Sequence, residues 1–449
     1  MTPRSVRVWK DLHKWTSLAC TLFLFILCLT GLPLIFHEEI DRALGATAAP
    51  DHVAADAPMI SLDRVIEIGH AQRPNEAITF AVPDDDDPVW FLFFASAINS
   101  PKINAVMTID GRTGNVLRVG DSARSPVIKF ITDLHTDLLL DEKGMLFLGV
   151  IGLCFVIAMI SGVVVYGPFM RRLDFGTVRP HSRRLYWLDL HNLAGMALAA
   201  WLLAVGVTGT INTLAQQIAR HWQRTELVEM IAPWRNAPVP AKLASAQKAM
   251  ETALTYAPGM KVSSIAMPGS LFAGGHHYDV FLHGDTPLTS KLLMPVMINA
   301  ADGSFTESRE LPWYAKVLFL SKPLHFGDYG GMPLKIIWAV LDVITLGVLG
   351  SGLYLWLARR PRRGGPRRGR RAAFPTRPGT PAMTSTPRHR SFGQIFLIPA
   401  IMALFVALGL VSALLGDGIW DALSWFCLLV PVIAVAYYVG RRRSRRRTV

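Results

Sequence analysis

Long apolar runs, separated by polar segments, dominate the chain and predict helices that span a membrane. An α-helix needs about 20 mostly apolar residues to cross the hydrocarbon core of a bilayer. We therefore predict six spans, at 15–36, 145–167, 193–214, 333–357, 394–416 and 419–440. The first run is longer than the apolar core of a cleaved signal peptide, which has about 7–15 residues. We expect it to remain as a membrane anchor.

Two long polar segments, 37–134 and 215–325, separate these spans and have the pattern of small α+β domains. Apolar residues at a helical period predict helices at 62–72 and 242–256. Runs of aromatic and β-branched residues predict strands at 89–94, 105–109, 278–282 and 292–298.

The chain also contains an internal repeat, in which each unit is a span, an outside domain and a second span. Five short sequences recur at an offset of 178 or 190 residues: Asp11-Leu12-His13 as Asp189-Leu190-His191, Thr30-Gly31 as Thr208-Gly209, Val106-Met107 as Val296-Met297, Leu134-His135 as Leu324-His325, and Ser161-Gly162 as Ser351-Gly352. The last two spans have no counterpart. We predict a mainly α membrane protein with a four-helix core from the duplicated unit, two outside α+β domains and two extra C-terminal spans.

Composition and charge placement agree with this architecture. The chain is 51% hydrophobic and 18% charged, whereas soluble proteins carry about 25% charged residues. Four short flanks (1–14, 169–190, 358–392 and the tail from 441) hold 26 of the 46 Lys and Arg residues but three of the 33 acidic residues. Because Lys and Arg gather on the cytoplasmic side of spans, we expect both termini inside and the α+β domains outside. The net charge of +13 therefore reflects topology, and we predict no nucleic-acid binding.

These assignments divide the chain into ten segments, namely the cytoplasmic N-terminus and first span (1–36), outside domain 1 (37–134), the second span (135–168), a cytoplasmic loop (169–192), the third span (193–214), outside domain 2 (215–325), the fourth span (326–357), a basic Pro/Gly-rich linker that we expect to be disordered (358–392), the fifth and sixth spans (393–440) and a basic tail (441–449). All four cysteines lie in apolar segments, so no disulfide can support the outside domains.

Four duplicated histidines are the candidate chemistry. His13 and His191 open the first and third spans at the cytoplasmic face, and His135 and His325 precede the second and fourth spans at the external face. A zinc site needs three or four protein ligands, whereas a six-coordinate haem needs two, because the porphyrin supplies the other four bonds. Two bis-histidine haems, one near each face, are one interpretation. Interfacial anchors, or packing histidines that were copied with the repeat, are the other.

The sequence around these histidines resembles a known family. The blocks 11–18, TDLHTDLLL at 132–140, 189–195 and LHFGDYGG at 324–331 are similar to those of the PepSY-associated transmembrane family, and within it to inner-membrane ferric-siderophore reductases of Gram-negative bacteria. The resemblance covers roughly residues 5–360. It implies two periplasmic PepSY domains, b-type haems on His13, His135, His191 and His325, and reduction of imported ferric chelates.

Other residues are weaker candidates. His37, at the external end of the first span, could replace His135 or His325 as a ligand, although its repeat equivalent is Ala215. Asp342 is a carboxyl group within the fourth span, which suggests proton uptake, a quinol contact or a hydrogen bond to a neighbouring helix. In the second outside domain His276, His277 and His283 form a cluster, and we expect a solvated strand there rather than a metal or chelate contact.

The sequence lacks a G-x-G-x-x-G or Walker motif. A redox protein of this kind must therefore receive electrons from a quinol or a separate cytoplasmic reductase. We predict a ferric chelate reductase in the bacterial inner membrane. Two other classes stay open: a periplasmic binding or regulatory protein whose helices are anchors, and a small-molecule exporter that uses Asp342 and the extra spans.

Overall fold

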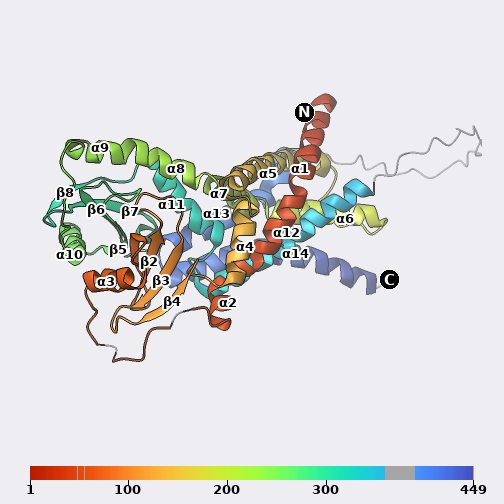
Figure 1. The fold of residues 1–449 in the computed structure, drawn as a ribbon. Helices are drawn as coiled ribbons and strands as arrows, with labels where there is room; N and C mark the ends of the chain where they lie inside the picture. Colours follow the sequence, from red (N-terminus) through yellow and green to blue (C-terminus); the bar gives the residue numbers. More distant parts are fainter. Residues whose placement is uncertain (48, 55, 359–389, 448–449) are drawn as a thin grey trace, which may run out of the picture.

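A bundle of long apolar helices and one antiparallel sheet make up the protein, with the sheet at one end of the bundle (Figure 1). The computed structural model describes residues 1–47, 49–54, 56–358 and 390–447, and side chains up to residue 441. The predicted disordered linker lies almost entirely outside these residues. Both labelled chain ends lie away from the sheet (Figure 1). We call the two ends of the bundle the sheet end and the terminal end.

Five of the six predicted spans lie on helices that are long and apolar enough to cross a membrane. These are α1 (Pro3–Ile35), α5 (Asp141–Met170), α12 (Gly331–Leu357), α13 (Phe392–Leu415) and α14 (Ile419–Arg447). The protein is therefore a multi-pass membrane protein.

The third span differs from the single helix predicted at 193–214. It consists of α6 (Arg183–Ala197) and α7 (Ala199–Asn212), which are bent by 65° at Leu198. The backbone of Leu198 has φ −92° and ψ −2°, far from the helical ψ of about −42°. The apolar pattern could not predict this bend, because the run continues through it and holds no proline.

The core of the bundle is a ring of four spans, in which the bent pair of α6 and α7 counts as one. α1 packs against α5 and α12, α5 packs against α7, and α12 packs against α6. α13 and α14 join the same apolar cluster, in which Trp201 of α7 and Trp338 of α12 meet Met402 and Leu428. The two extra spans are thus packed on the duplicated core.

The two predicted α+β domains share one eight-stranded sheet with the order β4-β3-β2-β1-β5-β6-β7-β8. Its strands are β1 (Ala77–Pro83), β2 (Val89–Ala95), β3 (Ala105–Asp110), β4 (Val116–Gly120), β5 (Lys261–Ala266), β6 (His277–His283), β7 (Leu293–Asn299) and β8 (Phe305–Ser308). All neighbouring strands are antiparallel, and the two repeat units join where Phe80 of β1 pairs with Ala266 of β5.

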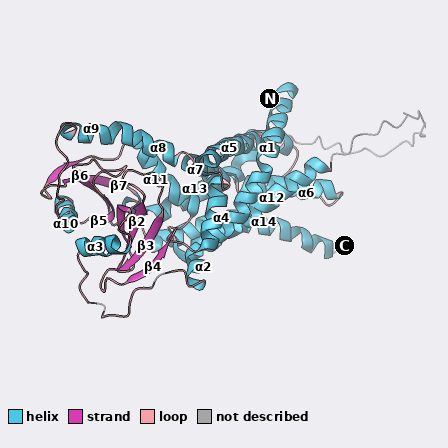
Figure 2. Ribbon diagram, viewed as in Figure 1, coloured by secondary structure: helices cyan, strands magenta, loops and turns pink. Residues whose placement is uncertain are grey.

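Helices cover both faces of this sheet (Figure 2). On one face α3 (Leu62–Gln72) and α10 (Ala246–Tyr256) pack on a core that includes Leu92, Met107 and Val280. On the other face, α8 (Ala215–Trp222), a π-helical turn (Gln223–Leu227) and α11 (Trp313–Phe326) contribute to a second core around Phe281. The short α9 (Val228–Ile231) follows the π-helical turn.

The strand register corrects one of the predicted repeats. Met107 lies in the core under α3, but in the second unit Val296 and Ile298, not Met297, occupy that core. The matching turns give an offset of 189, since Asp110 and Asn299 each accept a hydrogen bond from a glycine four residues later. A shift of one residue moves every side chain to the other face of the sheet. The predicted match of Val106-Met107 to Val296-Met297 was therefore wrong by one position.

Short helices connect the sheet to the bundle. α2 (His37–Ala43) follows α1, α4 (Pro126–Asp137) precedes α5, and α11 precedes α12. α4 begins at a Ser125 cap, whose hydroxyl oxygen accepts a hydrogen bond from the amide of Ile128. α4 and α11 carry His135 and His325 in their last turns.

Candidate functional site

The four duplicated histidines form two pairs. The ring centroids of His13 on α1 and His191 on α6 are 6.4 Å apart, with an angle of 62° between the ring planes. The centroids of His135 on α4 and His325 on α11 are also 6.4 Å apart, with an angle of 56°. Each pair therefore takes one histidine from each repeat unit.

The two pairs lie at opposite ends of the bundle. His13 belongs to the pair at the terminal end, and Gly31, on the same helix, contacts His135 of the other pair. At 1.5 Å per residue, the 18 residues between them correspond to about 27 Å along α1. That is close to the thickness of a hydrocarbon core, about 30 Å.

The Nδ1 atom of each imidazole is held by the neighbouring helix of its own repeat unit. Nδ1–H of His13 donates to the Ala158 carbonyl at 2.8 Å, and that of His325 donates to the Val205 carbonyl at 3.0 Å. Nδ1–H of His191 lies 3.1 Å from both the Val348 carbonyl and the Ser351 hydroxyl. Nδ1 of His135 lies 2.9 Å from the Thr30 hydroxyl.

The hydroxyl oxygens of Thr30 and Ser351 must accept the hydrogen bond from the imidazole Nδ1–H. Thr30 Oγ1 already donates to the Ile26 carbonyl at 2.7 Å, and Ser351 Oγ donates to the Val348 carbonyl at 2.8 Å. A hydroxyl group has one proton to donate. All four imidazoles therefore carry their proton on Nδ1, and each keeps a lone pair on Nε2.

Each of the four imidazoles faces a Ser or Thr residue that is followed by a glycine, and the glycine makes room for the ring. The four dipeptides are Thr30-Gly31, Ser161-Gly162, Thr208-Gly209 and Ser351-Gly352. A Cβ atom added to Gly209 would lie 2.7 Å from Cε1 of His325, and one added to Gly162 would lie 3.0 Å from Cε1 of His13. The corresponding distances are 3.3 Å for Gly352 and His191, and 3.4 Å for Gly31 and His135. We call each such Ser/Thr-Gly dipeptide, together with the carbonyl three residues before it, an imidazole seat.

The geometry of both pairs fits two imidazoles on opposite sides of one metal ion. A metal–imidazole bond is about 2.0 Å long and a ring nitrogen lies about 1.1 Å from the ring centre, which places two trans rings roughly 6.2 Å apart. Metal-binding histidines usually donate their second ring N–H to a carbonyl or carboxylate, as all four seats allow. In the described part of the chain, no group of three or more His, Cys, Asp or Glu residues could hold a metal ion by itself. A haem, which needs two protein ligands, fits this donor set.

An ion pair ties α6 to the preceding loop at Asp189, two residues before His191. The buried carboxylate of Asp189 accepts hydrogen bonds from the Arg179 guanidinium at 2.7 and 2.9 Å and from the Arg179 backbone amide at 2.8 Å. The aspartate of this repeated Asp-Leu-His sequence thus positions the helix that carries a paired histidine.

The two weaker membrane candidates have contacts of their own. His37 is at the start of α2, where its Nδ1–H donates to the Leu34 carbonyl at 2.9 Å. Asp342 is buried on α12, within hydrogen-bonding reach of the Cys28 thiol on α1, while its Oδ2 atom has no partner. The structure therefore places Asp342 in a helix–helix contact between the two ends of the bundle.

The second outside domain has the expected strand, but the expectation that this strand is solvated was wrong. His277, Asp279 and His283 of β6 are all buried, with at most 5% of their surface exposed. Burial lowers the pKa of His277 to about 4 and raises the pKa of Asp279 well above its usual value. His276, by contrast, is partly exposed, and its Nε2–H donates to the Ala237 carbonyl. The period-two pattern placed the three residues on one face, and Trp234, at the end of a 3-10 helical turn (Ala232–Trp234), packs against His277 with the two ring centroids 4.5 Å apart.

Comparison with known families agrees with this architecture. The sequence model described as the PepSY-associated TM region matches residues 10–359. The chain belongs to the PepSY-associated transmembrane family. The match covers both histidine pairs and ends two residues after α12, so α13 and α14 lie outside the family region. A search among curated proteins found no match.

The imidazole seats were missed as functional residues in this family member. Thr30-Gly31, Ser161-Gly162, Thr208-Gly209 and Ser351-Gly352 were recognised as repeated sequences, but no role followed from them. Their signal was the shared dipeptide: all four seats have Ser or Thr followed by Gly in an apolar helix. Only the fold shows that each faces a histidine of its own unit.

Proposed function

We propose that the protein is a transmembrane haem-b oxidoreductase with two haems, held by His13 with His191 and by His135 with His325. The observation that carries this proposal is the duplicated pair of imidazoles, 6.4 Å apart, whose Nδ1 atoms are all engaged in hydrogen bonds and whose Nε2 atoms have no hydrogen-bond partner among the described residues. A bound haem would accept and release one electron at a time at its iron.

The residues of the chain prepare these positions for a metal. Each seat fixes the ring orientation and the tautomer, and a hydrogen bond from Nδ1–H to a carbonyl raises the basicity of Nε2. Most of the surrounding helices are long and apolar, which lowers the polarity around the two pairs. Because the seats are built within one unit and the pairs between two units, neither half of the chain can complete a pair alone.

The distribution of charge supports one orientation of the protein in the membrane, and this orientation sets the direction of electron transfer. We place the terminal end in the cytoplasm and the sheet in the periplasm of a bacterial inner membrane, since basic residues mark the cytoplasmic side. Electrons would enter from a quinol or a cytoplasmic reductase and reduce a ferric chelate, such as a ferric siderophore, near the sheet. Reduction to the ferrous ion loosens the chelate, because hard oxygen donors prefer the more highly charged ferric ion.

Absorption spectroscopy of the purified protein tests this proposal. We expect a red protein with a haem-b spectrum that changes on addition of dithionite, and transfer of electrons to an added ferric chelate. A colourless protein that still binds a periplasmic partner would contradict the proposal and favour a binding or regulatory role for the sheet.

A further inference from the structure

Lys322 lies one helical turn before His325 on α11. Residues three apart on an α-helix are neighbours on its surface, so this lysine and the paired histidine share one side of α11. Lys322 is exposed, and its Nζ atom lies 5.1 Å from the centre of the Phe319 ring, which packs on the second core of the sheet. The ammonium group is therefore on the side of the His135–His325 pair that faces the sheet.

Lys322 is the cation left without a carboxylate on the two helices that carry this pair. α4 and α11 hold three lysines and no arginine. Lys129 pairs with Asp133 at 2.6 Å, and Lys316 pairs with Glu310 at 2.6 Å. Lys322 has no ion-pair partner among the described residues. Its contact with an aromatic ring is weaker than a hydrogen bond between charged groups, so Lys322 is free to bind an added carboxylate.

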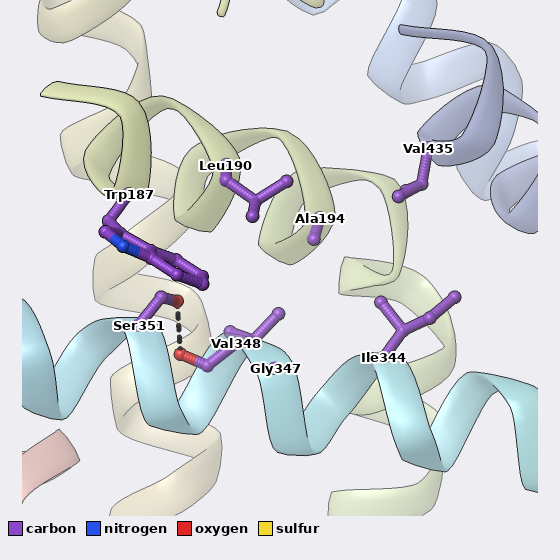
Figure 3. A pocket seen from close by; sticks show the side chains of 8 residues that line it. All are labelled: Trp187, Leu190, Ala194, Ile344, Gly347, Val348, Ser351 and Val435. Carbon is purple, nitrogen blue, oxygen red and sulfur yellow. Dashed lines mark hydrogen bonds between the residues drawn. The ribbon is translucent and has the colours of Figure 1, made fainter. Parts of the chain in front are cut away.

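The terminal end shows the same spacing. Lys10 precedes His13 by three residues on α1, is exposed, and has no ion-pair partner in the described part of the chain. The seat of the other histidine, His191, is apolar on the side that faces α6 and α14, where residues such as Trp187 and Leu190 lie and none of the labelled residues is charged (Figure 3). In each pair, therefore, one histidine has an unpaired lysine one turn away, on the side away from the middle of the bundle.

The chemistry of a haem requires such a cation. Haem carries two propionate groups on one edge of its porphyrin ring, and a carboxylate that leaves water without a cationic partner is costly. Among apolar helices, this edge is favoured on the side away from the middle of the bundle, where Lys322 and Lys10 lie. An ammonium group binds a carboxylate through charge-assisted hydrogen bonds.

We propose that Lys322 binds a propionate group of the haem at the His135–His325 pair, and that Lys10 does so at the other pair. The inference rests on the proposed function, because it needs a haem at each pair. It goes further in naming the residues that recognise the carboxylates of the cofactor and restrain its rotation about the axis through the two imidazoles.

Haem loss from the purified full-length protein in nanodiscs, measured as transfer to excess apomyoglobin, tests the role of Lys322. The parent protein carries His13→Ala with His191→Ala, so that the haem at the sheet end is observed alone. We expect Lys322→Gln to lose this haem about tenfold faster, because a hydrogen bond between charged groups is lost. Lys322→Arg keeps the charge and should behave as the parent does. The matched control is Lys316→Gln on the same helix, whose lysine already has a carboxylate partner, and it should leave the rate unchanged.

A haem with both propionates converted to methyl esters separates this role from a structural one. After extraction of haem and reconstitution, the ester should leave the parent about tenfold faster than haem does, whereas both should leave Lys322→Gln at the same rate.

Two results would overturn the inference and leave the histidine pairs standing: equal haem loss from the parent and Lys322→Gln, or an unchanged preference of Lys322→Gln for haem over its ester. If the first is accompanied by a raised KM for an anionic ferric chelate, the lysine binds the chelate instead. A wild-type protein without haem would contradict the proposed function and this inference with it.

Discussion

At the scale of single residues, the four seat glycines are the most restrictive positions of the candidate site. Each lies against an imidazole, so a Cβ atom added at that position would crowd the ring. The distances differ enough to predict a graded response. Gly209 leaves the least room, with 2.7 Å to His325, and Gly31 leaves the most, with 3.4 Å to His135.

We therefore predict that Gly209→Ala displaces the His325 ring and that Gly31→Ala has a smaller effect on His135. Haem content and the spin state in the absorption spectrum measure this, because a displaced ligand leaves a five-coordinate, high-spin iron. Gly393→Ala, in open space on α13, is the control and should keep a low-spin spectrum. A Gly209→Ala protein that has the wild-type spectrum would show that the seat does not position the ligand.

A second prediction at this scale concerns the backbone conformation of Leu138. It ends α4 at φ 56°, whereas α11 in the second unit ends at Gly327 with φ 68°. A left-handed conformation costs a non-glycine residue about 1–2 kcal/mol. Leu138→Gly should stabilise the protein by up to about 1 kcal/mol, measured by thermal unfolding. Leu140→Gly is the control, since Leu140 has an ordinary φ of −119° and should gain nothing. A lower melting temperature for Leu138→Gly would mean that the side chain matters more than the strain.

His277 gives a pH dependence with a defined sign. Burial holds its pKa at about 4 in the folded state, compared with 6.5 in an unfolded chain. Below pH 6.5 the unfolded state takes up a proton that the folded state does not, so stability is lost as the pH falls from 6.5 to about 4. The loss is at most about 3 kcal/mol. Unfolding of His277→Leu should depend less on pH over this range, and that of the exposed control His70→Leu should not differ from wild type. An unchanged pH profile for His277→Leu contradicts this assignment.

At the scale of secondary-structure elements, the hydrophobic pattern predicted where spans and strands occur better than it predicted their shape. Five spans and four strands were found where the pattern placed them, because burial in lipid or under a helix requires apolar residues at a fixed period. The hydrophobic pattern does not indicate the bend at Leu198. The strands β1, β4, β5 and β8 were also missed. β4 and β8 have no fully buried residue, whereas β1 and β5 have three each and were simply not recognised.

The two C-terminal helices support a prediction about truncation. Both histidine pairs and all four seats lie between residues 13 and 352, whereas α13 and α14 contribute apolar contacts. Apolar surfaces uncovered by their removal would face lipid, which is as apolar as the lost neighbours. A chain that ends at Ala358 should therefore keep two haems. Loss of haem from this truncated chain would mean that α13 and α14 hold the core together.

At the scale of the whole molecule, the site is a product of duplication. Each histidine is seated by its own unit and faces its equivalent in the other unit. Sequence repeats and charge placement could predict that His13 would meet His191 and that His135 would meet His325, because topology assigns each pair to one face. They could not predict the seats, because the contacts between α1 and α5 or between α7 and α11 depend on how the helices pack. Nor could they predict that the two α+β units share one sheet, because the contact of β1 with β5 joins residues from different repeats.

The haem content of single and double histidine variants tests the central claim most directly. By pyridine haemochrome assay, the wild type should contain two haems per chain, and each single His→Ala variant should lose or destabilise one. The double variant His13→Ala with His191→Ala should resemble its single variants and keep the haem of the other pair. The double variant His13→Ala with His135→Ala should lose both. A haem-free wild type, or retention of one intact haem when His13 and His135 are both replaced, would contradict the pairing of the two repeat units.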